Sequence, residues 1–262
     1  MCASQKVGII AGGGDLPARL REALSHQGYE PVIGRLGADF SVGQAGKIIS
    51  FFKSQHVSRL VLVGSLSRPN WWTVRADFRG LKIISKLILK SVGDDALLKI
   101  IRRELESEGF EICGVHEFMP ELLCLAGVLG SLQPDKNAEQ AIVHGIGAAR
   151  QHGQDDLGQA VVVDARSGKV IAKETCSGTD ALIRSVRESD VPKILVKMSK
   201  PQQDMALDMP TIGTRTIEEA RKSGFIGIVA EAGATLVPEQ DKIIDLCNRY
   251  EIFFKGVSAD DI

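Results

Sequence analysis

The first half of the chain alternates short apolar runs with segments whose hydrophobic positions recur at helical spacing. The apolar runs predict buried strands at 6–11, 29–34, 59–64 and 110–115. The helical spacing predicts helices at 17–27, 43–55, 77–90 and 94–107. Strands that alternate with helices are typical of βαβ units, so this half predicts a largely parallel, Rossmann-like sheet.

The second half returns to this alternation after a change of character. Residues 137–152 are rich in alanine and glycine and only weakly amphipathic, which predicts a connecting helix. Strands are expected at 159–164, 169–173, 193–197, 225–230 and, as a final edge strand, 252–255. Helices are expected at 180–188 and 239–250, and a capping box from Thr216 to Glu219 predicts a short helix between them.

The expected fold class is therefore α/β, with two α/β domains. The first, at 1–133, carries the parallel sheet and a glycine-rich loop. A helical connector spans 134–156. The second domain, at 157–262, carries a mixed sheet, because its first two strands form a hairpin around Arg166-Ser167-Gly168.

Composition limits the class of protein. The chain has 262 residues, 44% hydrophobic and 25% charged, which is ordinary for a soluble globular protein. No run approaches the roughly 18–20 apolar residues of a membrane span, so a cytoplasmic location is expected. The net charge of −1 gives no reason to expect nucleic-acid binding. The five cysteines are widely spaced without a C-x-x-C pair, so neither a disulfide framework nor a zinc site is indicated.

The loop at 197–213, K-M-S-K-P-Q-Q-D-M-A-L-D-M-P-T-I-G, is the first candidate for chemistry. It follows a buried strand, and Pro201 and Pro210 restrict its backbone. Polar loops at strand ends are where α/β folds place their sites. Its lysines can hold phosphate oxygens, and its aspartates can hold a divalent cation or a water molecule. The alternative is a solvated turn with ordinary surface charges.

A second candidate is the turn Gly12-Gly13-Gly14-Asp15 between the first strand and the first helix. A helix N-terminus offers amide donors to phosphate, and glycines permit close approach. The dinucleotide fingerprint fits only at Gly12 and Gly14, because Pro17 stands where the last glycine belongs. A redox cofactor is therefore disfavoured. A phosphate loop and a tight turn without a ligand carry equal weight.

Other polar positions also lie at predicted turns. Gly178, Thr179 and Asp180 precede a helix, where an N-cap role is more common, and Glu231 follows a strand. The scattered histidines are expected at the surface or at helix ends. Trp71 and Trp72 precede a basic amphipathic pattern within 68–90, which is either a membrane-surface element or a helix with its apolar face in the core.

Several motifs resemble, in the expected order, the UDP-2,3-diacylglucosamine pyrophosphatases of the LpxI type, which act in lipid A biosynthesis. They are A-G-G-G-D-L-P at 11–17, V-G-S-L-S-R-P at 63–69, G-D-D-A-L-L at 93–98, G-Q-A-V-V-V at 158–163, G-T-D-A-L-I at 178–183, K-M-S-K-P-Q-Q-D at 197–204 and D-M-P-T-I-G at 208–213. The chain departs from the family pattern at Ser177 and Ala206.

The resemblance implies two α/β domains that hold a lipid-linked UDP-sugar between them. It also implies magnesium-dependent hydrolysis of the pyrophosphate bond to UMP and 2,3-diacylglucosamine 1-phosphate, with peripheral contact to the inner membrane; a homodimer stays open. Asp208 is expected to bind Mg²⁺ or to orient the water, with Asp204 as second carboxylate and Lys200 on a phosphate. The remaining expected substrate-binding residues are Gly12, Gly13, Gly14, Asp15, Gly178, Thr179, Asp180, Lys197, Thr211 and Glu231.

Two other functions stay open on the residues alone. The first is a non-catalytic nucleotide- or sugar-nucleotide-binding protein, which the departures at Ser177 and Ala206 keep in view. The second is a nicotinamide oxidoreductase, which the incomplete glycine fingerprint weakens.

Overall fold

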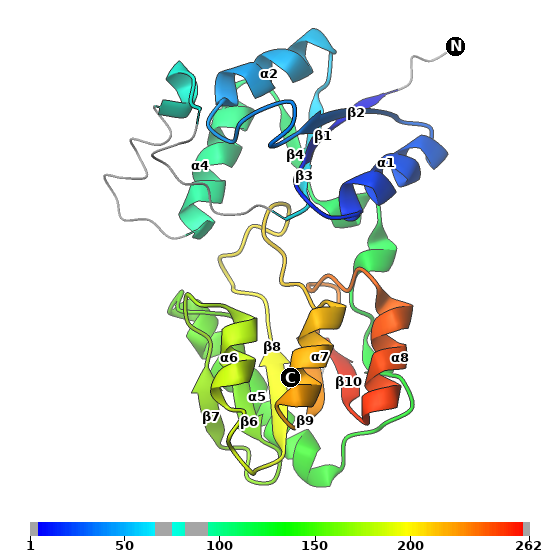
Figure 1. Ribbon diagram of the computed structural model, residues 1–262, viewed down its shortest axis with the longest axis vertical. Helices are drawn as coiled ribbons and strands as arrows, with labels where there is room; N and C mark the ends of the chain where they lie inside the picture. Colours follow the sequence, from blue (N-terminus) through cyan, green and yellow to red (C-terminus); the bar gives the residue numbers. More distant parts are fainter. Residues whose placement is uncertain (1–4, 66–74, 82–93, 259–262) are drawn as a thin grey trace. The chain divides into compact units, whose positions relative to one another are not determined.

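The computed structural model describes residues 5–65, 75–81 and 94–258, so the tryptophan pair and most of the basic pattern lie outside the described residues. The chain forms two compact units. The first comprises Met1–Pro120 with Asp204–Asp208, and the second comprises Glu121–Gln203 with Met209–Ile262. Each unit has its own sheet flanked by helices, parallel in the first and mixed in the second (Figure 1), which confirms the expected fold class.

The sheet of the first unit has the strand order β2-β1-β3-β4. Its strands are β1 (Lys6–Ala11), β2 (Glu30–Arg35), β3 (Arg59–Val63) and β4 (Glu111–Cys113). Its helices are α1 (Leu16–His26), α2 (Ala45–Ser54) and α4 (Asp94–Ser107). Because the chain leaves β1 toward β2 and returns to β3 on the other side, the strand order reverses beside β1. Ligands bind at such reversals, outside the carboxyl ends of the strands.

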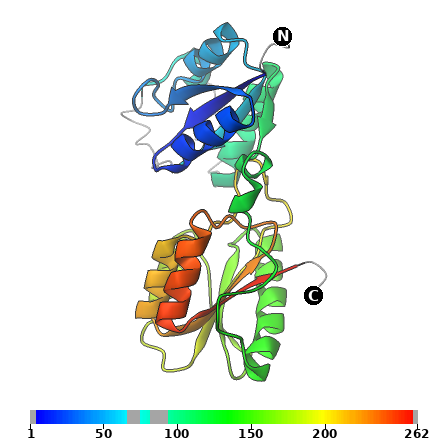
Figure 2. The same cartoon turned by 90° about the vertical axis from the view of Figure 1, so that its right-hand side faces the viewer.

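The two faces of this sheet bury alternate residues of each strand. Ile10 of β1 and Leu60 of β3 pack with Phe52 of α2 and Leu105 of α4 in one core cluster. The alternate residues Val7 and Ile9 point to the other face, which α1 covers (Figure 2). Helices on both faces bury most of β1 and β3, and this leaves the carboxyl ends of the strands as the place for polar groups.

The sheet of the second unit has the order β5-β10-β9-β8-β6-β7. Its strands are β5 (Gly127–Leu129), β6 (Ala160–Asp164), β7 (Val170–Lys173), β8 (Lys193–Lys197), β9 (Phe225–Glu231) and β10 (Phe253–Val257). Its helices are α5 (Lys136–Gln154), α6 (Thr179–Ser185), α7 (Thr214–Lys222) and α8 (Gln240–Tyr250). Helix α5 covers one face, and the other three helices cover the opposite face (Figure 2).

The segment expected as a connector is the long helix α5, which packs on the sheet of the second unit. Ala141, Ile146 and Ala149 share a core cluster with Val161 and Val196 of the sheet. The small residues that weakened its amphipathic pattern permit this close packing. A Cβ on Gly145 would lie 2.7 Å from the Val196 side chain.

Two local expectations differ from the structure. The strand near 252–255 is β10, which lies inside the sheet because the unpredicted strand β5 pairs with it and forms the edge. The predicted capping box is wrong. Helix α7 begins at Thr214 with Gly213 as its N-cap, and Thr216 is a buried residue of the helix. The position of α7 is therefore set by the packing of its buried apolar face, because no side-chain cap is formed.

Candidate functional site

The glycine turn after β1 is joined to the turn after β3 by backbone hydrogen bonds. Gly12 N donates to Val63 O at 2.8 Å, and Gly13 exchanges bonds with Ser65 at 2.8 and 2.9 Å. A Cβ on Gly12 would lie 2.6 Å from Ser65 O. The two glycines are therefore required by the close approach of two strand-end turns, and the protein itself uses their amides.

The second half of this turn is open to a ligand. Gly14 has a φ of +92° and directs the chain into α1, whose first turn contains Pro17. Within the described part of the chain, the amides of Gly14, Asp15 and Leu16 donate to no protein acceptor. Amides at a helix N-terminus attract anions. The amides of Gly12 and Gly13 are therefore excluded from the predicted anion site, and those of Gly14 and Asp15 remain candidates.

The segment Asp204–Asp208 belongs to the first unit, although it lies within the second half of the sequence. The Asp204 carboxylate accepts a hydrogen bond from Arg102 of α4 at 2.5 Å and one from Ala206 N at 3.1 Å. Asp208 N donates to Asp204 O at 2.8 Å, which closes the turn. The Asp204 hydrogen bond is the main reason that the pKa of Arg102 is raised. Asp204 therefore holds the turn that carries Asp208.

The same turn contacts the residue that follows β4. A Cβ on Gly114 would lie 3.3 Å from Ala206 Cα and would also overlap the His116 ring. Within the described residues, His116 Nδ1 is buried without a hydrogen-bond partner. From the sequence, His116 is expected only as one of the scattered histidines at the surface or at helix ends, so its buried nitrogen was not predicted. Its position just after a strand end is the signal that could have identified it.

The carboxyl edge of the second sheet carries a buried polar chain. Lys197 Nζ donates to Thr179 Oγ1 and to Thr211 O, both at 3.1 Å. Thr179 Oγ1 donates in turn to Glu174 at 2.5 Å. The other oxygen of Glu174 accepts from Gln159 N at 2.8 Å. Lys197 and Glu174 are each 6% exposed. Three residues that were predicted for the site, Lys197, Thr179 and Thr211, therefore lie together. They surround the buried carboxylate of Glu174, which was not predicted.

The remaining predicted residues of this unit have other partners. Glu231 accepts from Ser199 N at 2.8 Å and from Ser199 Oγ at 2.5 Å, at the end of the neighbouring strand. Lys200 pairs with Asp156 at 3.0 Å. Asp180 lies in the first turn of α6 and pairs with Arg215 at 2.9 Å, and Gly178 is the N-cap of that helix with a φ of +80°. Glu231 thus orders the backbone just after β8, while Asp180 serves a helix terminus.

The expected magnesium ligands are Asp204 and Asp208. Asp204 already accepts from the guanidinium of Arg102, which makes its carboxylate a poor ligand for a cation. In the part of the chain that the structure describes, no group of three or more histidine, cysteine, aspartate or glutamate side chains could hold an ion. Mg²⁺ often takes one carboxylate together with waters and substrate phosphates. The donor set therefore fits that ion only through Asp208 and substrate oxygens.

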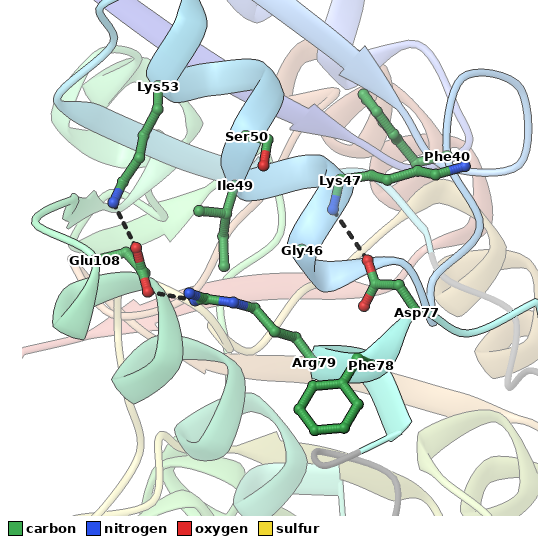
Figure 3. A pocket seen from close by; sticks show the side chains of 10 residues that line it. All are labelled: Phe40, Gly46, Lys47, Ile49, Ser50, Lys53, Asp77, Phe78, Arg79 and Glu108. Atoms are coloured by element: carbon green, nitrogen blue, oxygen red, sulfur yellow. Dashed lines mark hydrogen bonds and ion pairs between the residues drawn. The ribbon is translucent and has the colours of Figure 1, made fainter.

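A cavity of about 800 Å³ lies beside α2 in the first unit (Figure 3). Glu108 accepts hydrogen bonds from Lys53 and Arg79 there, and these bonds lower the pKa of Glu108. Asp77 caps two backbone segments, accepting from Lys47 N at 3.0 Å and from Gly80 N at 2.8 Å. The wall is otherwise apolar, and the neighbouring Phe78 is 86% exposed. The cavity therefore combines apolar surface with positive charge.

The fold and the site together define a two-unit α/β protein. Each unit is an α/β unit that gathers polar groups at the carboxyl ends of its strands. The first offers open helix-terminal amides and an anchored aspartate turn, and the second offers a buried lysine and carboxylate. Such groups suit a phosphorylated substrate. No helix among the described residues has the length and apolarity needed to cross a membrane.

The chain belongs to the LpxI family. The profile of the LpxI N-terminal domain matches residues 6–122, and that of the LpxI C-terminal domain matches residues 125–255. A curated relative from Caulobacter vibrioides, the UDP-2,3-diacylglucosamine pyrophosphatase LpxI, is 36% identical over 281 aligned residues. That alignment covers 98% of this chain and 99% of the relative.

Proposed function

We propose that this protein hydrolyses the pyrophosphate bond of UDP-2,3-diacylglucosamine, giving UMP and 2,3-diacylglucosamine 1-phosphate for lipid A biosynthesis. The observation that carries the proposal is the 36% identity to a pyrophosphatase of that name over nearly the full length of both chains. The open amides at Gly14 and the anchored turn of Asp208 support it, because they supply an anion-binding group and a carboxylate.

The residues divide the work of hydrolysis in the following way. Asp208 holds the metal or orients the attacking water, and Asp204 and Arg102 keep its turn in place. The amides of Gly14 and Asp15 bind phosphate oxygens. In the second unit, Lys197, held by Thr179, offers a positive charge to a phosphate group of the substrate. When bound, Mg²⁺ supplies further charge neutralisation through Asp208 and the substrate phosphates.

The test is UMP release by the purified protein from UDP-2,3-diacylglucosamine, with Mg²⁺ or with a chelator in its place. We expect chelator-sensitive release by the natural chain, and loss of at least about a hundredfold in Asp208→Ala. Asp241→Ala, which removes an exposed acid of α8, is the matched control and should keep full activity. Tight substrate binding without UMP release would instead favour a non-catalytic nucleotide-binding protein. Full activity of Asp208→Ala would remove Asp208 from the site.

We further propose that the protein is cytoplasmic and contacts the membrane surface through the cavity beside α2. Phe78 lines the cavity and is 86% exposed, and the nearby Leu81 is 57% exposed. The three cations of the lining outnumber its two carboxylates, so one positive charge remains. Exposed apolar groups among cations bind anionic bilayers. A diacylated substrate would also have to be taken from such a surface.

Sedimentation with anionic phosphatidylglycerol vesicles tests this contact. The Phe78→Ser/Leu81→Ser variant should bind the vesicles several-fold more weakly than the natural chain, because about 0.8 kcal/mol is lost per buried methylene group. The control Leu125→Ser/Val143→Ser removes two exposed apolar side chains of the second unit. If both variants bind equally, the surface beside α2 is not the membrane contact.

A further inference from the structure

A second cavity, of about 530 Å³, lies at the end of β8 that is opposite to Lys197. The register of β6 and β8 places it there, since Ala160 pairs with Lys197 at one edge and Asp164 pairs with Lys193 at the other. Lys193 begins β8 and lines the cavity. This site is therefore separate from the polar chain of Lys197, Thr179 and Glu174.

The cavity is strongly basic. Five basic side chains line it and only one acidic one, Asp190. The basic residues are Arg166, Arg187, Lys193, Arg221 and Lys222. Glu219 pairs with two of them, at 3.4 Å from Arg187 and 3.0 Å from Lys222, but offsets only one positive charge. Arg166 and Arg221 form no ion pair within the described part of the chain, although the charge of Arg166 helps to lower the pKa of the nearby Asp164. A surplus of positive charge remains.

Helix termini account for only part of this charge. Helices α6 and α7 end near the cavity, and Arg221 and Lys222 in the last turn of α7 favour the negative end of its dipole. Arg166 belongs to the turn between β6 and β7, and Lys193 belongs to a strand. These two residues serve no helix terminus, yet they line the same cavity.

Lys193 is the most informative residue of the cavity. It is 2% exposed, and among the described residues its ammonium group donates to a single acceptor, the carbonyl oxygen of Ser189. Burial lowers the pKa of Lys193, and the nearby Asp190 opposes this shift. A buried ammonium group is costly unless it is paired and fully hydrogen-bonded. An anion in the cavity would supply both the charge and the missing acceptors.

We propose that this cavity binds a phosphate group, carried by a soluble phosphorylated small molecule. The buried Lys193 lines the cavity, and guanidinium groups for the oxygens come from Arg166 in the turn between β6 and β7 and from Arg221 in the last turn of α7. Guanidinium groups bind phosphate through paired hydrogen bonds, and three cations suit a dianion better than a chloride ion. The inference does not rest on the hydrolytic activity proposed above, because none of these residues belongs to that site.

Equilibrium dialysis with radiolabelled inorganic phosphate, at constant ionic strength, tests the proposal on the full chain. We expect the natural chain to bind phosphate, and Arg166→Gln/Arg221→Gln to bind it at least about tenfold more weakly. Arg249→Gln/Lys242→Gln removes two exposed charges of α8 and is the matched control, which should bind as the natural chain does. Lys197→Gln removes the proposed phosphate contact at the other end of these strands, so any binding lost in this variant belongs to that site and not to this cavity.

Three results would overturn the proposal. They are the absence of phosphate binding by the natural chain, unchanged binding by Arg166→Gln/Arg221→Gln, and a loss of binding confined to Lys197→Gln. Circular dichroism of each variant ensures that a loss reflects the cavity and not unfolding. UMP release is measured in parallel. Loss of phosphate binding with UMP release retained supports the second site, whereas absence of UMP release in every protein bears only on the proposed function.

Discussion

Arg102 of α4 donates a hydrogen bond to the carboxylate of Asp204 at 2.5 Å, although 102 residues separate the two in sequence. The bond holds the Asp204–Asp208 turn against the first unit, and the apolar contacts of Ala206 and Leu207 with its core reinforce it. Asp204 is thus a positioning residue for the turn that carries Asp208.

Breaking this bond should weaken both stability and turnover. The Asp204 side chain is 15% exposed, so Arg102→Ala leaves a largely buried carboxylate without its cation. We expect a loss of about 1–3 kcal/mol in the free energy of unfolding, measured in urea, and a fall in kcat. A double-mutant cycle with Asp204→Ala separates the pair from its surroundings. Additive effects of the two changes would show that the bond contributes nothing of its own.

His116 should matter for turnover because it packs beside Gly114, which also lies close to the Asp204–Asp208 turn. His116→Gln replaces a ring whose buried Nδ1 lies beside Gly114. We expect kcat to fall about tenfold or more, with KM for the substrate little altered. His26→Gln, on an exposed helix end, is the control. An unchanged kcat together with a loss of stability would assign His116 a packing role alone.

Thr179 links a buried cation to a buried carboxylate, and its hydroxyl is required for both bonds. Thr179→Val keeps the shape of the side chain but leaves Lys197 and Glu174 each short of a partner. We expect a loss of about 1–3 kcal/mol in unfolding free energy, and Thr179→Ser should restore most of it. Equal stabilities of the valine and serine variants would contradict the hydrogen-bonded chain.

Gly12 is required by the close approach of two turns, so its smallest replacement should be harmful. In Gly12→Ala the new methyl carbon would meet Ser65 O at 2.6 Å. Separating the turns should cost about 1–3 kcal/mol of stability. Gly147→Ala is the matched control. Its Cβ meets nothing within 4 Å, and alanine in a helix interior should stabilise the chain by about 0.5–1 kcal/mol. A neutral Gly12→Ala would show that the two turns can separate freely.

Glu108 should make the first unit sensitive to acid. Hydrogen bonds from Lys53 and Arg79 lower the pKa of Glu108 in the folded chain. A lowered folded pKa contributes stability above the unfolded pKa, and this contribution is lost as the pH falls through the folded value, below about 4.3. Glu108→Gln should therefore be less stable near neutral pH and converge with the natural chain in acid. Parallel stability curves for the two proteins would contradict this linkage.

The sequence predicted most elements because periodicity reports burial within one element. The bounds of β1, β8 and α4 agree with the apolar patterns at 6–11, 193–197 and 94–107. Local patterns did not predict the elements whose position depends on packing against distant parts of the chain. Helix α5 has a weak amphipathic pattern because its small residues pack closely against a sheet. Strand β5 has only three residues, too few to show an alternating pattern, and it is defined by its pairing with β10.

The sequence by itself determined the α/β class with one parallel and one mixed sheet, and the polar loops that follow the strands. Only the tertiary structure decided which of these loops meet. It assigned Asp204–Asp208 to the first unit, engaged the amides of Gly12 and Gly13 within the protein, and brought Glu174 to Lys197. The physical reason is that local spacing encodes which face of an element is buried. Hydrogen bonds between distant residues depend instead on which strand ends the folded sheets bring together.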